Sequence, residues 1–349
     1  MGLKKYLQMK NGLLVYRTNP VNNIFNIGDY IQSLAARQYF DHIDVYINRE
    51  ELGTYSEARV RMILNGWFTH DPSNFPPSNN ILPLFVAFHL NSSIYPILDS
   101  TQIVDYFKRH QPIGCRDYKT VEILKARGID AYFTGCLTLT LGNKYKVHKR
   151  RNDHIYIVDP FHANLYSTSQ LLGIALKNIT KTPSLIKLTQ KYRGRVTLRN
   201  YFKTLSFYNK YKSILSDDVI LNSTYINHEI PDRFETDDAK FEYAVKLLDC
   251  YANARYVITS RIHCALPCLA LNTPVMFVER VDDPEISKCR MGGLLELFHR
   301  IIYSKESLYS TNGISYFTID TNFKNKPNYI TLKDKLESIC GEFIKNTKE

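Results

Sequence analysis

The sequence predicts an α/β fold in which two Rossmann-like domains face a cleft. Short apolar segments alternate with segments of helical periodicity, which is typical of parallel sheets covered by helices. The length of 349 residues suits two domains. A polar and basic stretch at residues 142–153 interrupts the alternation. We therefore predict an N-terminal domain over 1–145, a second domain over 146–310 and a C-terminal extension with a closing helix over 311–349.

The first half of the chain opens with the pattern of a βαβ unit. Residues 12–16 form a short apolar segment that predicts a strand, and residues 30–40 carry apolar side chains at the spacing of one helical face. Residues 44–47 predict the second strand of the unit. The other elements expected in this half are strands at 60–64, 83–89 and 130–133 and a helix at 118–127, which Gly128 closes.

The second half repeats the alternation, and its best-defined unit lies between residues 254 and 279. This unit comprises a strand, a turn, an apolar helix rich in small residues and a second strand. The elements expected in this half are strands at 155–158, 256–259 and 275–278, and helices between 160 and 212 and at 238–251, 264–271 and 332–344.

Positive charge is concentrated in one region. Residues 144–212 contain fifteen lysines and arginines against two acids, Asp153 and Asp159, and this excess is larger than the net charge of +11 of the whole chain. Such a region suits nucleic acid, an anionic membrane surface or a substrate that bears a diphosphate, and a solvated face without a partner is the alternative. We disfavour nucleic acid, because no zinc-finger, RNA-recognition or basic-zipper pattern accompanies the charge.

Composition and hydropathy predict a cytoplasmic location. No apolar run reaches the roughly 18–20 residues of a membrane span, and no signal-peptide core follows the first lysines. The basic region at 144–212 adds the expectation of peripheral contact with the inner membrane face. The seven cysteines are odd in number and irregularly spaced, which predicts free thiols rather than a disulfide scaffold.

The turn after the expected strand at 256–259 carries the most chemistry. Ser260, Arg261 and His263 stand where a strand ends and a helix begins, and free backbone N–H groups and the helix dipole favour an anion there. A guanidinium grips phosphate or carboxylate with two hydrogen bonds, and a histidine beside it can donate a proton. The alternative is equally open: Ser260 caps the helix and Arg261 forms a surface salt bridge.

Residues 257–266 resemble the Arg-Leu-His signature of the polysaccharide pyruvyl transferase family, with Ile262 in place of the commoner leucine. Three further stretches resemble family motifs in the same order, so the resemblance spans about residues 11–300. These stretches are an Asn-x-Gly-Asp loop formed by Asn26, Ile27, Gly28 and Asp29, an Arg-Asp block at Arg116 and Asp117, and Lys288 after the last strand. The chain departs from the family pattern at Asn65-Gly66-Trp67, where a Gly-Gly run is common, and this places a bulky ring in or beside the site.

The resemblance implies phosphoenolpyruvate as the donor and two sugar hydroxyls as acceptors in a reaction that forms a pyruvate ketal. Because the donor bears a phosphate and a carboxylate, cations are needed, and the matching positions are Arg116, Arg261 and Lys288. His263 is the natural general acid, since an unperturbed histidine pKa of about 6.5 lies near working pH. The other residues expected to bind substrate are Ser260, Asn26, Gly28, Asp29, Asn65 and His89.

The base that takes a hydroxyl proton is left open among Asp29, Asp117 and Glu279, which all follow predicted strand ends. The alternative for Asp29 and Asp117 is helix capping, and for Glu279 it is a loop salt bridge. His89 also follows a predicted strand, and the alternative is a hydrogen-bonded loop residue. The chemistry needs no cofactor, and we expect no metal, because His263 and the two cysteines after it lack a fourth ligand at recognisable spacing.

Two other classes of function stay open at this stage. A nucleotide-sugar glycosyltransferase has the same glycosyltransferase-B-like architecture, and Arg261 and Lys288 would equally hold a nucleotide diphosphate. A glycan-binding relative without activity is disfavoured, because the cationic residues and His263 are present. For pyruvyl transfer the expected partners are phosphoenolpyruvate, on the side of the second domain, and a glycan acceptor on the side of the first. The basic region at 144–212 fits an acceptor linked to a lipid diphosphate.

Overall fold

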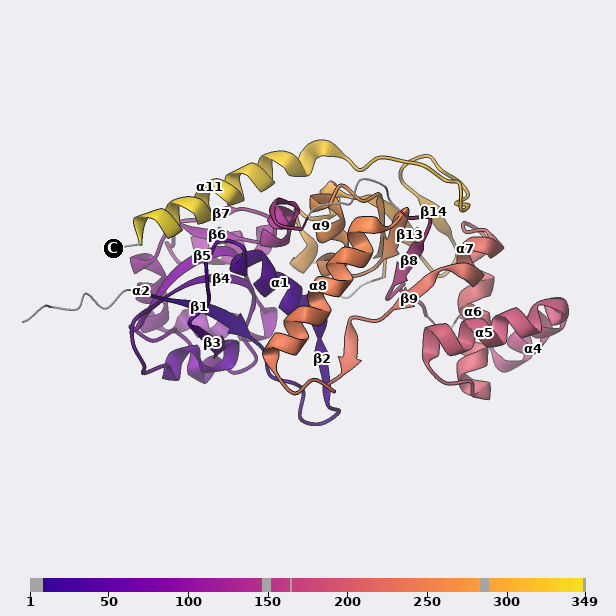
Figure 1. The fold of residues 1–349 in the computed structure, drawn as a ribbon, viewed down its shortest axis with the longest axis horizontal. Helices are drawn as coiled ribbons and strands as arrows, with labels where there is room; N and C mark the ends of the chain where they lie inside the picture. Colours follow the sequence, from indigo (N-terminus) through magenta and orange to yellow (C-terminus); the bar gives the residue numbers. More distant parts are fainter. Residues whose placement is uncertain (1–8, 146–151, 164, 283–288, 348–349) are drawn as a thin grey trace, which may run out of the picture.

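The computed structural model describes residues 9–145, 152–163, 165–282 and 289–347, which form two six-stranded sheets with helices packed around them (Figure 1). The first sheet has the strand order β3-β1-β4-β5-β6-β7 and is parallel throughout. Its strands are β1 (Lys10–Val15), β3 (Val45–Asn48), β4 (Val60–Phe68), β5 (Ile81–Leu90), β6 (Ile113–Cys115) and β7 (Ala131–Phe133).

The second sheet has the order β14-β13-β12-β11-β8-β9 and is parallel except at its edge, where β14 pairs antiparallel with β13. Its strands are β8 (Ile155–Val158), β9 (Thr224–Ile226), β11 (Tyr256–Thr259), β12 (Val275–Arg280), β13 (His299–Tyr303) and β14 (Leu308–Ser310). β8 and β11 coincide with the predicted ranges. The expectation of parallel sheets in an α/β fold is confirmed.

Helices flank both sheets, as the alternating pattern predicts. Those of the first half are α1 (Ile27–Arg37), α2 (Thr101–Arg109) and α3 (Tyr118–Lys125). Those of the second half are α4 (Thr168–Lys177), α5 (Thr182–Arg193), α6 (Leu198–Tyr211), α7 (Asp217–Asn222), α8 (Asp237–Asn253), α9 (Ile262–Ala270) and α11 (Ile330–Asn346).

α1 begins three residues earlier than the hydrophobic pattern predicts. Asn26 is its N-cap, and the side-chain oxygen accepts a hydrogen bond from the Gly28 N–H at 3.0 Å. Asp29 therefore lies in the first turn of the helix instead of capping it. The capping alternative for Asp29 is wrong, because Asn26 already fills that place.

A short antiparallel pairing of two strands joins the two halves of the chain. β2 (Ile24–Asn26) pairs antiparallel with β10 (Glu229–Pro231), and the Ile27 N–H donates to the His228 carbonyl at 2.9 Å. This contact holds the start of α1 against the second half. Neither strand is visible in the sequence pattern, because three residues are too few to show a periodicity.

One hydrophobic core runs from the first sheet through α8 and α9 to α11, which extends back over the first half (Figure 1, yellow). Leu336, Cys340 and Ile344 of α11 are buried in this core, and the Arg61 guanidinium donates to the Ile344 carbonyl at 3.1 Å. The predicted domain limits stay predictions, since residues 146–151 within the expected boundary lie outside the described residues.

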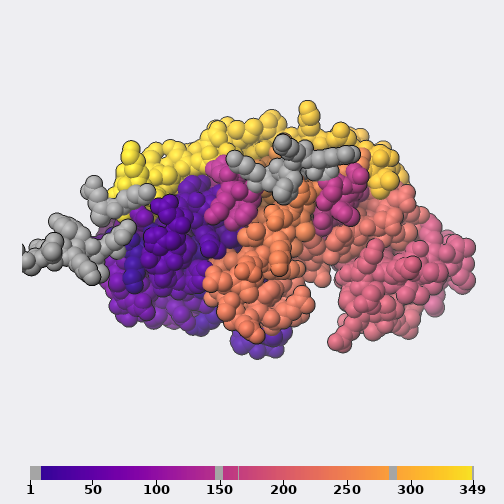
Figure 2. Space-filling view, viewed as in Figure 1, coloured from indigo at the N-terminus to yellow at the C-terminus, as the bar shows by residue number. Residues whose placement is uncertain are grey.

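The helices α4, α5 and α6 form a lobe at the far end of the second sheet, and we call residues 168–211 the helical lobe. Figure 2 shows the helical lobe projecting from the body, with a hollow between it and the segment of α8. Leu185 and Leu188 of α5 and Leu205 and Phe207 of α6 pack in a second core with β8 and β11. The lobe is therefore anchored to the sheet through α5 and α6.

The two halves also meet where the backbone of Gly142 approaches α9. A Cβ added to Gly142 would lie 2.1 Å from the carbonyl oxygen of Ala270, a backbone atom that cannot move without shifting the helix. Only glycine fits this contact.

We predict that Gly142→Ala lowers the free energy of unfolding by about 2 kcal/mol, because overpacking against a rigid backbone costs on that order. The matched control is Gly341→Ala in α11, where an added Cβ meets nothing within 4 Å. This control should raise the free energy of unfolding by about 0.5–1 kcal/mol through helix propensity. Urea unfolding followed by circular dichroism measures both, and equal values would contradict the close approach.

Candidate active site

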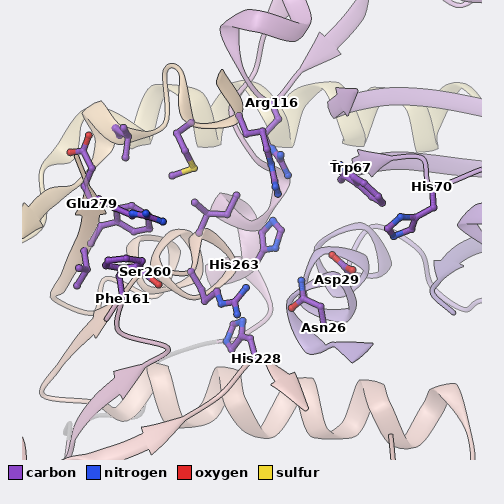
Figure 3. A pocket seen from close by; sticks show the side chains of 18 residues that line it. Asn26, Asp29, Trp67, His70, Arg116, Phe161, His228, Ser260, His263 and Glu279 are labelled. Carbon is purple, nitrogen blue, oxygen red and sulfur yellow. The ribbon is translucent and has the colours of Figure 1, made fainter. Parts of the chain in front are cut away.

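A pocket of about 520 Å³ collects side chains from both halves of the chain (Figure 3). Trp67 lies on one side, Phe161 and Glu279 lie on the other, and Arg116 and His263 stand between them. The pocket thus joins loops that are more than 200 residues apart in the sequence.

The pocket lies at the carboxyl ends of parallel strands in both sheets, where ligands bind in open α/β folds. Arg116 directly follows β6, Ser260 and Arg261 follow β11, and Glu279 is near the end of β12. The loops after these three strands, which the sequence also selected, therefore meet in one place.

Arg116 is fully buried, with an exposed fraction of 0 %. Its Nε, Nη1 and Nη2 atoms have no hydrogen-bond partner among the described residues. The backbone N–H of Arg116 donates to the Phe88 carbonyl at 2.8 Å, which fixes where the side chain begins. A buried charge is costly unless an opposite charge pairs with it. The pocket is therefore suited to an anion that contacts Arg116.

His263 lies in the first turn of α9 and is only 8 % exposed. Burial and the nearby guanidinium of Arg116 lower its pKa well below 6.5, so the ring is neutral at pH 7. This differs from the unperturbed value expected from the sequence. Nε2 has no partner within the described part of the chain. A proton-donating role for His263 therefore requires a bound anion that raises its pKa again.

Gly28 gives α1 its close approach to His263. A Cβ added to Gly28 would lie 3.1 Å from the Cβ and 3.2 Å from the Nδ1 of His263. Gly28 is not part of the pocket lining, whereas its neighbours Asn26 and Asp29 are. The glycine of this loop thus positions the histidine through close packing.

Arg261 occupies the N-cap position of α9 and is held by two carboxylates. Its Nε donates to Oδ2 of Asp159 at 2.8 Å, and its Nη2 donates to Oε1 of Glu229 at 3.0 Å. The Ser260 hydroxyl donates to the Asp159 carbonyl and does not cap the helix. The capping alternative for Ser260 is therefore wrong, while Arg261 both forms salt bridges and lines the pocket.

Asp159 shapes this corner of the site. Its φ of +39° is in the left-handed region, which is strained for a residue with a Cβ, and such strain is common at functional sites. The Asp159 carboxylate also accepts a hydrogen bond from the His228 N–H at 2.8 Å. Asp159 therefore binds both the Arg261 guanidinium and the backbone of His228, the residue that precedes β10.

Asp29 is a half-buried carboxylate at the first turn of α1, and Gln32 donates to its Oδ1 at 3.1 Å. Burial raises the pKa of Asp29, and the guanidinium groups of Arg49 and Arg116 offset only part of that rise. A carboxylate whose pKa is raised is a stronger base than an ordinary one. Among the three candidate bases, Asp29 has the environment that best suits the role.

His89 and Asp117 form a fully buried pair outside the pocket lining, with 2.5 Å between Nδ1 and Oδ2. Asp117 also accepts from the Thr120 N–H at 2.9 Å and so caps α3. Burial and the charge of Arg116 lower the pKa of His89 to about 4. The structure therefore agrees with the helix-capping alternative for Asp117 and with the hydrogen-bonding alternative for His89.

The remaining sequence-selected residues have mixed positions. Glu279 lines the pocket, but its Oε2 also accepts from Nη1 of Arg300 at 2.7 Å. Asn65 is buried behind the pocket and donates to a backbone carbonyl of α1 at 2.9 Å, while Trp67 reaches the lining. The bulky ring expected from the Asn65-Gly66-Trp67 departure is therefore in the site. Lys288 lies outside the described residues.

Sequence reasoning missed several lining residues. The ring of His228 lies 2.8 Å from the Tyr251 hydroxyl, and burial and the charge of Arg261 lower its pKa to about 3. Arg290 is also in the lining, and burial and the charge of Arg116 lower its pKa. Arg290 could have been found from the sequence, because it is a second basic residue two positions after the selected Lys288. His228 precedes a three-residue strand and carries no such signal.

The pocket has an excess of positive charge. Its lining contains two carboxylates and four guanidinium groups, from Asp29 and Glu279 and from Arg116, Arg261, Arg280 and Arg290. In the described ranges no three His, Cys, Asp or Glu side chains cluster so as to hold a metal ion. Nor does any helix in those ranges combine the length and apolar character of a membrane span.

These features define an α/β protein with a cationic pocket at the carboxyl ends of its strands. The profile of the polysaccharide pyruvyl transferase family matches residues 26–282, and the chain therefore belongs to that family. No curated protein sequence matches the chain. A solved structure of a functionally uncharacterised protein from Klebsiella pneumoniae is similar at 14% identity and a TM-score of 0.41, over 81% of this chain and 88% of that one.

Arg116 has no hydrogen-bond partner among the described residues whereas Arg261 has two carboxylate partners, and this contrast predicts opposite effects on stability. Arg116→Met should raise the free energy of unfolding by about 1 kcal/mol or more, because it removes a buried and unpaired charge. The matched control, Arg261→Met, should lower it by about 1 kcal/mol, because it leaves Asp159 and Glu229 without their shared partner. Chemical denaturation measures both. A loss of stability in Arg116→Met similar to that of the control would mean that Arg116 has a partner in the free protein.

Proposed function

We propose that the protein transfers the pyruvyl group of phosphoenolpyruvate onto two hydroxyls of a sugar in a polysaccharide precursor, with a cyclic pyruvate ketal and phosphate as products. Membership of the family supports the class of reaction. The observation that carries the choice of donor is the buried guanidinium of Arg116 at the pocket, which has no partner among the described residues. Phosphate and carboxylate are the two groups that arginine binds best, and phosphoenolpyruvate bears both.

We also infer that the two sheets are the cores of two Rossmann-like domains in a glycosyltransferase-B-like arrangement, with the pocket in the cleft between them. The support is that strand ends from both sheets contribute to one pocket. The proposed donor cations come from both halves, since Arg116 belongs to the first, and Arg261 and Arg290 belong to the second. Donor binding therefore holds the two halves together.

In the proposed mechanism, His263 protonates the methylene carbon of the donor. The free ring is neutral, because burial and Arg116 lower its pKa. A bound phosphate dianion favours the imidazolium and raises that pKa, so the proton donor forms only when the donor is present. Nε2 has no hydrogen-bond partner within the described residues, so no other side chain competes for a proton on this atom.

The bonds and protons of the reaction balance without a cofactor. Protonation forms a C–H bond and leaves C2 of the donor as a cationic centre. The first hydroxyl oxygen bonds to C2, the bond from C2 to the phosphate oxygen breaks with its electron pair on phosphate, and the second hydroxyl oxygen then bonds to C2. Of the two hydroxyl protons released, one replaces the proton given to the methylene carbon and the other leaves with phosphate.

Asp29 is the proposed base for the attacking hydroxyl. Its carboxylate lines the pocket, and burial raises its pKa. Glu279 is the weaker candidate, because Arg300 already binds its carboxylate. The cations that hold the donor also stabilise the departing phosphate, which carries growing negative charge as the C–O bond breaks.

We predict that His263→Gln lowers phosphate release from phosphoenolpyruvate by about 100-fold or more, the range expected for loss of a general acid. The affinity for phosphoenolpyruvate should change much less, since the guanidinium groups are intact. The assay measures acceptor-dependent phosphate release with galactosyl and N-acetylmannosaminyl acceptors, and the ketal methyl group is followed by NMR.

The control for this experiment is His42→Gln, which changes an exposed histidine outside the pocket lining. Full activity of His263→Gln would reject the proposed proton donor. Binding of a sugar nucleotide by the wild type, without phosphate release from phosphoenolpyruvate for any acceptor, would favour glycosyl transfer instead.

We further propose that the helical lobe docks on an anionic membrane at the cytoplasmic side, where a lipid-linked acceptor would lie. Residues 168–212 contain ten lysines and arginines and no acid. Six of the thirteen large apolar side chains that are exposed in the described residues fall in this short region: Leu172, Leu176, Ile179, Ile186, Val196 and Leu198. Apolar side chains among basic ones are typical of helices that bind at a lipid interface.

We predict that the double change Leu172→Ser and Leu176→Ser weakens binding to vesicles of mixed phosphatidylcholine and phosphatidylglycerol by about tenfold. The two leucines are 52 % and 70 % exposed and one helical turn apart, so they lie on one face of α4. The control, Val21→Ser, changes an apolar residue that is 92 % exposed in the first half. Sedimentation with the vesicles measures binding, and equal binding of both variants would reject the lobe as the membrane contact.

A further inference from the structure

A second pocket, of about 390 Å³, lies beside the first along the same edge of the second sheet. The two pockets share the side chains of Phe161, Ser260 and Arg261 as a common wall. The second pocket lies over the carboxyl ends of β8, β9 and β11, because Asp159, Asn227 and Ser260 directly follow these strands. It thus continues the ligand-binding edge of the sheet away from Arg116 and toward the helical lobe.

His162 is the polar side chain in this pocket whose bonding is least satisfied. Both ring nitrogens, Nδ1 and Nε2, are buried and have no hydrogen-bond partner among the described residues. Phe207 of α6 packs against the ring with 5.9 Å between the ring centres, which fixes its position. Burial of both ring nitrogens without hydrogen bonds costs folding free energy, and a ligand that supplies hydrogen-bonding groups would offset this cost.

Arg193 provides the positive charge. It is the last residue of α5, and its guanidinium carbon lies over the Tyr192 ring, 3.9 Å from the ring centre. Its Nε is buried and has no partner within the described part of the chain. Burial, with the charges of Arg193 and Lys203, lowers the pKa of His162 to about 4, so the surroundings already favour an anion over a proton on this ring.

One carboxylate, that of Asp159, also lines this pocket, and it already forms a salt bridge. Asp159 pairs with Nε of Arg261 at 2.8 Å and accepts from the His228 N–H, also at 2.8 Å. The charge of Arg193 is therefore not cancelled by Asp159. An anion in this pocket would meet a guanidinium, an imidazole and the hydroxyl-bearing turn at Ser260.

We propose that the second pocket binds the diphosphate of a glycosyl diphosphate acceptor, with its sugar extending past Phe161 into the first pocket. This rests on the proposed function, which requires a sugar acceptor whose hydroxyls reach the donor. The shared wall makes one continuous path from the diphosphate to the reacting sugar, and Arg193 and His162 supply the hydrogen bonds that a diphosphate accepts.

The diphosphate has two possible carriers, a polyisoprenyl lipid and a nucleoside. Arg193 ends α5 within the helical lobe, and this lobe also carries the exposed leucines of α4, so the lobe offers apolar surface to a lipid carrier. The shared chemistry is the glycosyl diphosphate, and the experiment below separates the two carriers.

The test is calorimetric binding, without phosphoenolpyruvate, of three probes that carry the same sugar: a short-chain isoprenyl diphosphate, a uridine diphosphate and a methyl glycoside. We expect both diphosphates to bind more tightly than the methyl glycoside. Arg193→Gln should reduce that preference by about tenfold or more, the usual range for a hydrogen bond to a charged group. Arg195→Gln is the matched control, because it removes the same charge two residues away, outside the pocket lining.

The outcomes separate cleanly. An unchanged preference in Arg193→Gln, or an equal loss in Arg195→Gln, would overturn the subsite, and His162→Asn provides a second variant should Arg193→Gln fail to fold. The tighter of the two diphosphates identifies the carrier. Since the binding is measured without the donor, an absence of phosphate release from phosphoenolpyruvate would reject the proposed reaction and leave the diphosphate site standing. Phosphate release with the methyl glycoside as acceptor, without a binding preference for the diphosphates, would reject the diphosphate site and leave the proposed reaction standing.

Discussion

The site depends on a positive charge that the fold buries at Arg116 without a partner among the described residues. The carboxylate of the adjacent residue, Asp117, does not pair with it, because His89 and the first turn of α3 already use that carboxylate. The folded protein therefore carries an electrostatic cost that a ligand of opposite charge offsets. Residues that cost stability in the free protein and gain it on binding are typical of functional sites.

The same charge contributes to the proton affinities of the groups around it, next to burial and, for Asp29, the charge of Arg49. Together with burial, it lowers the pKa of His263, and it limits the rise that burial causes in the pKa of Asp29. A bound dianion reverses both effects, because it neutralises the guanidinium: the imidazole gains proton affinity, and the carboxylate becomes a stronger base. In the proposed reaction the acid and the base are thus brought toward their working states by one event, the binding of the donor at Arg116.

The sequence was sufficient to locate the loops of the site and insufficient to find the partners within it. The strand before Ser260 is an apolar run with clear ends, so its boundary and the turn that follows could be predicted. The carboxylates that hold Arg261 are 102 and 32 residues away along the chain. Asp159 arrives through the parallel pairing of β8 with β11, and Glu229 lies in β10, whose pairing with β2 is too short to leave a periodic pattern. The depressed pKa of His263 was equally hidden, since it arises from burial and from charges that only the tertiary fold brings near.

The two arginines of the first pocket show why position outweighs residue type. Arg261 is one-third exposed and shares its charge with two carboxylates, so it attracts an anion weakly, but its orientation is fixed and its other N–H groups can still donate. It is also part of the wall between the two pockets, and in the proposed reaction a fixed wall would keep the two substrates in constant relation. Arg116 supplies attraction because no carboxylate among the described residues forms a hydrogen bond with its guanidinium. At the exposed wall, water would screen an unpaired guanidinium. In the interior, a carboxylate partner would neutralise the charge of a paired one. Each arginine therefore suits the position that the fold gives it.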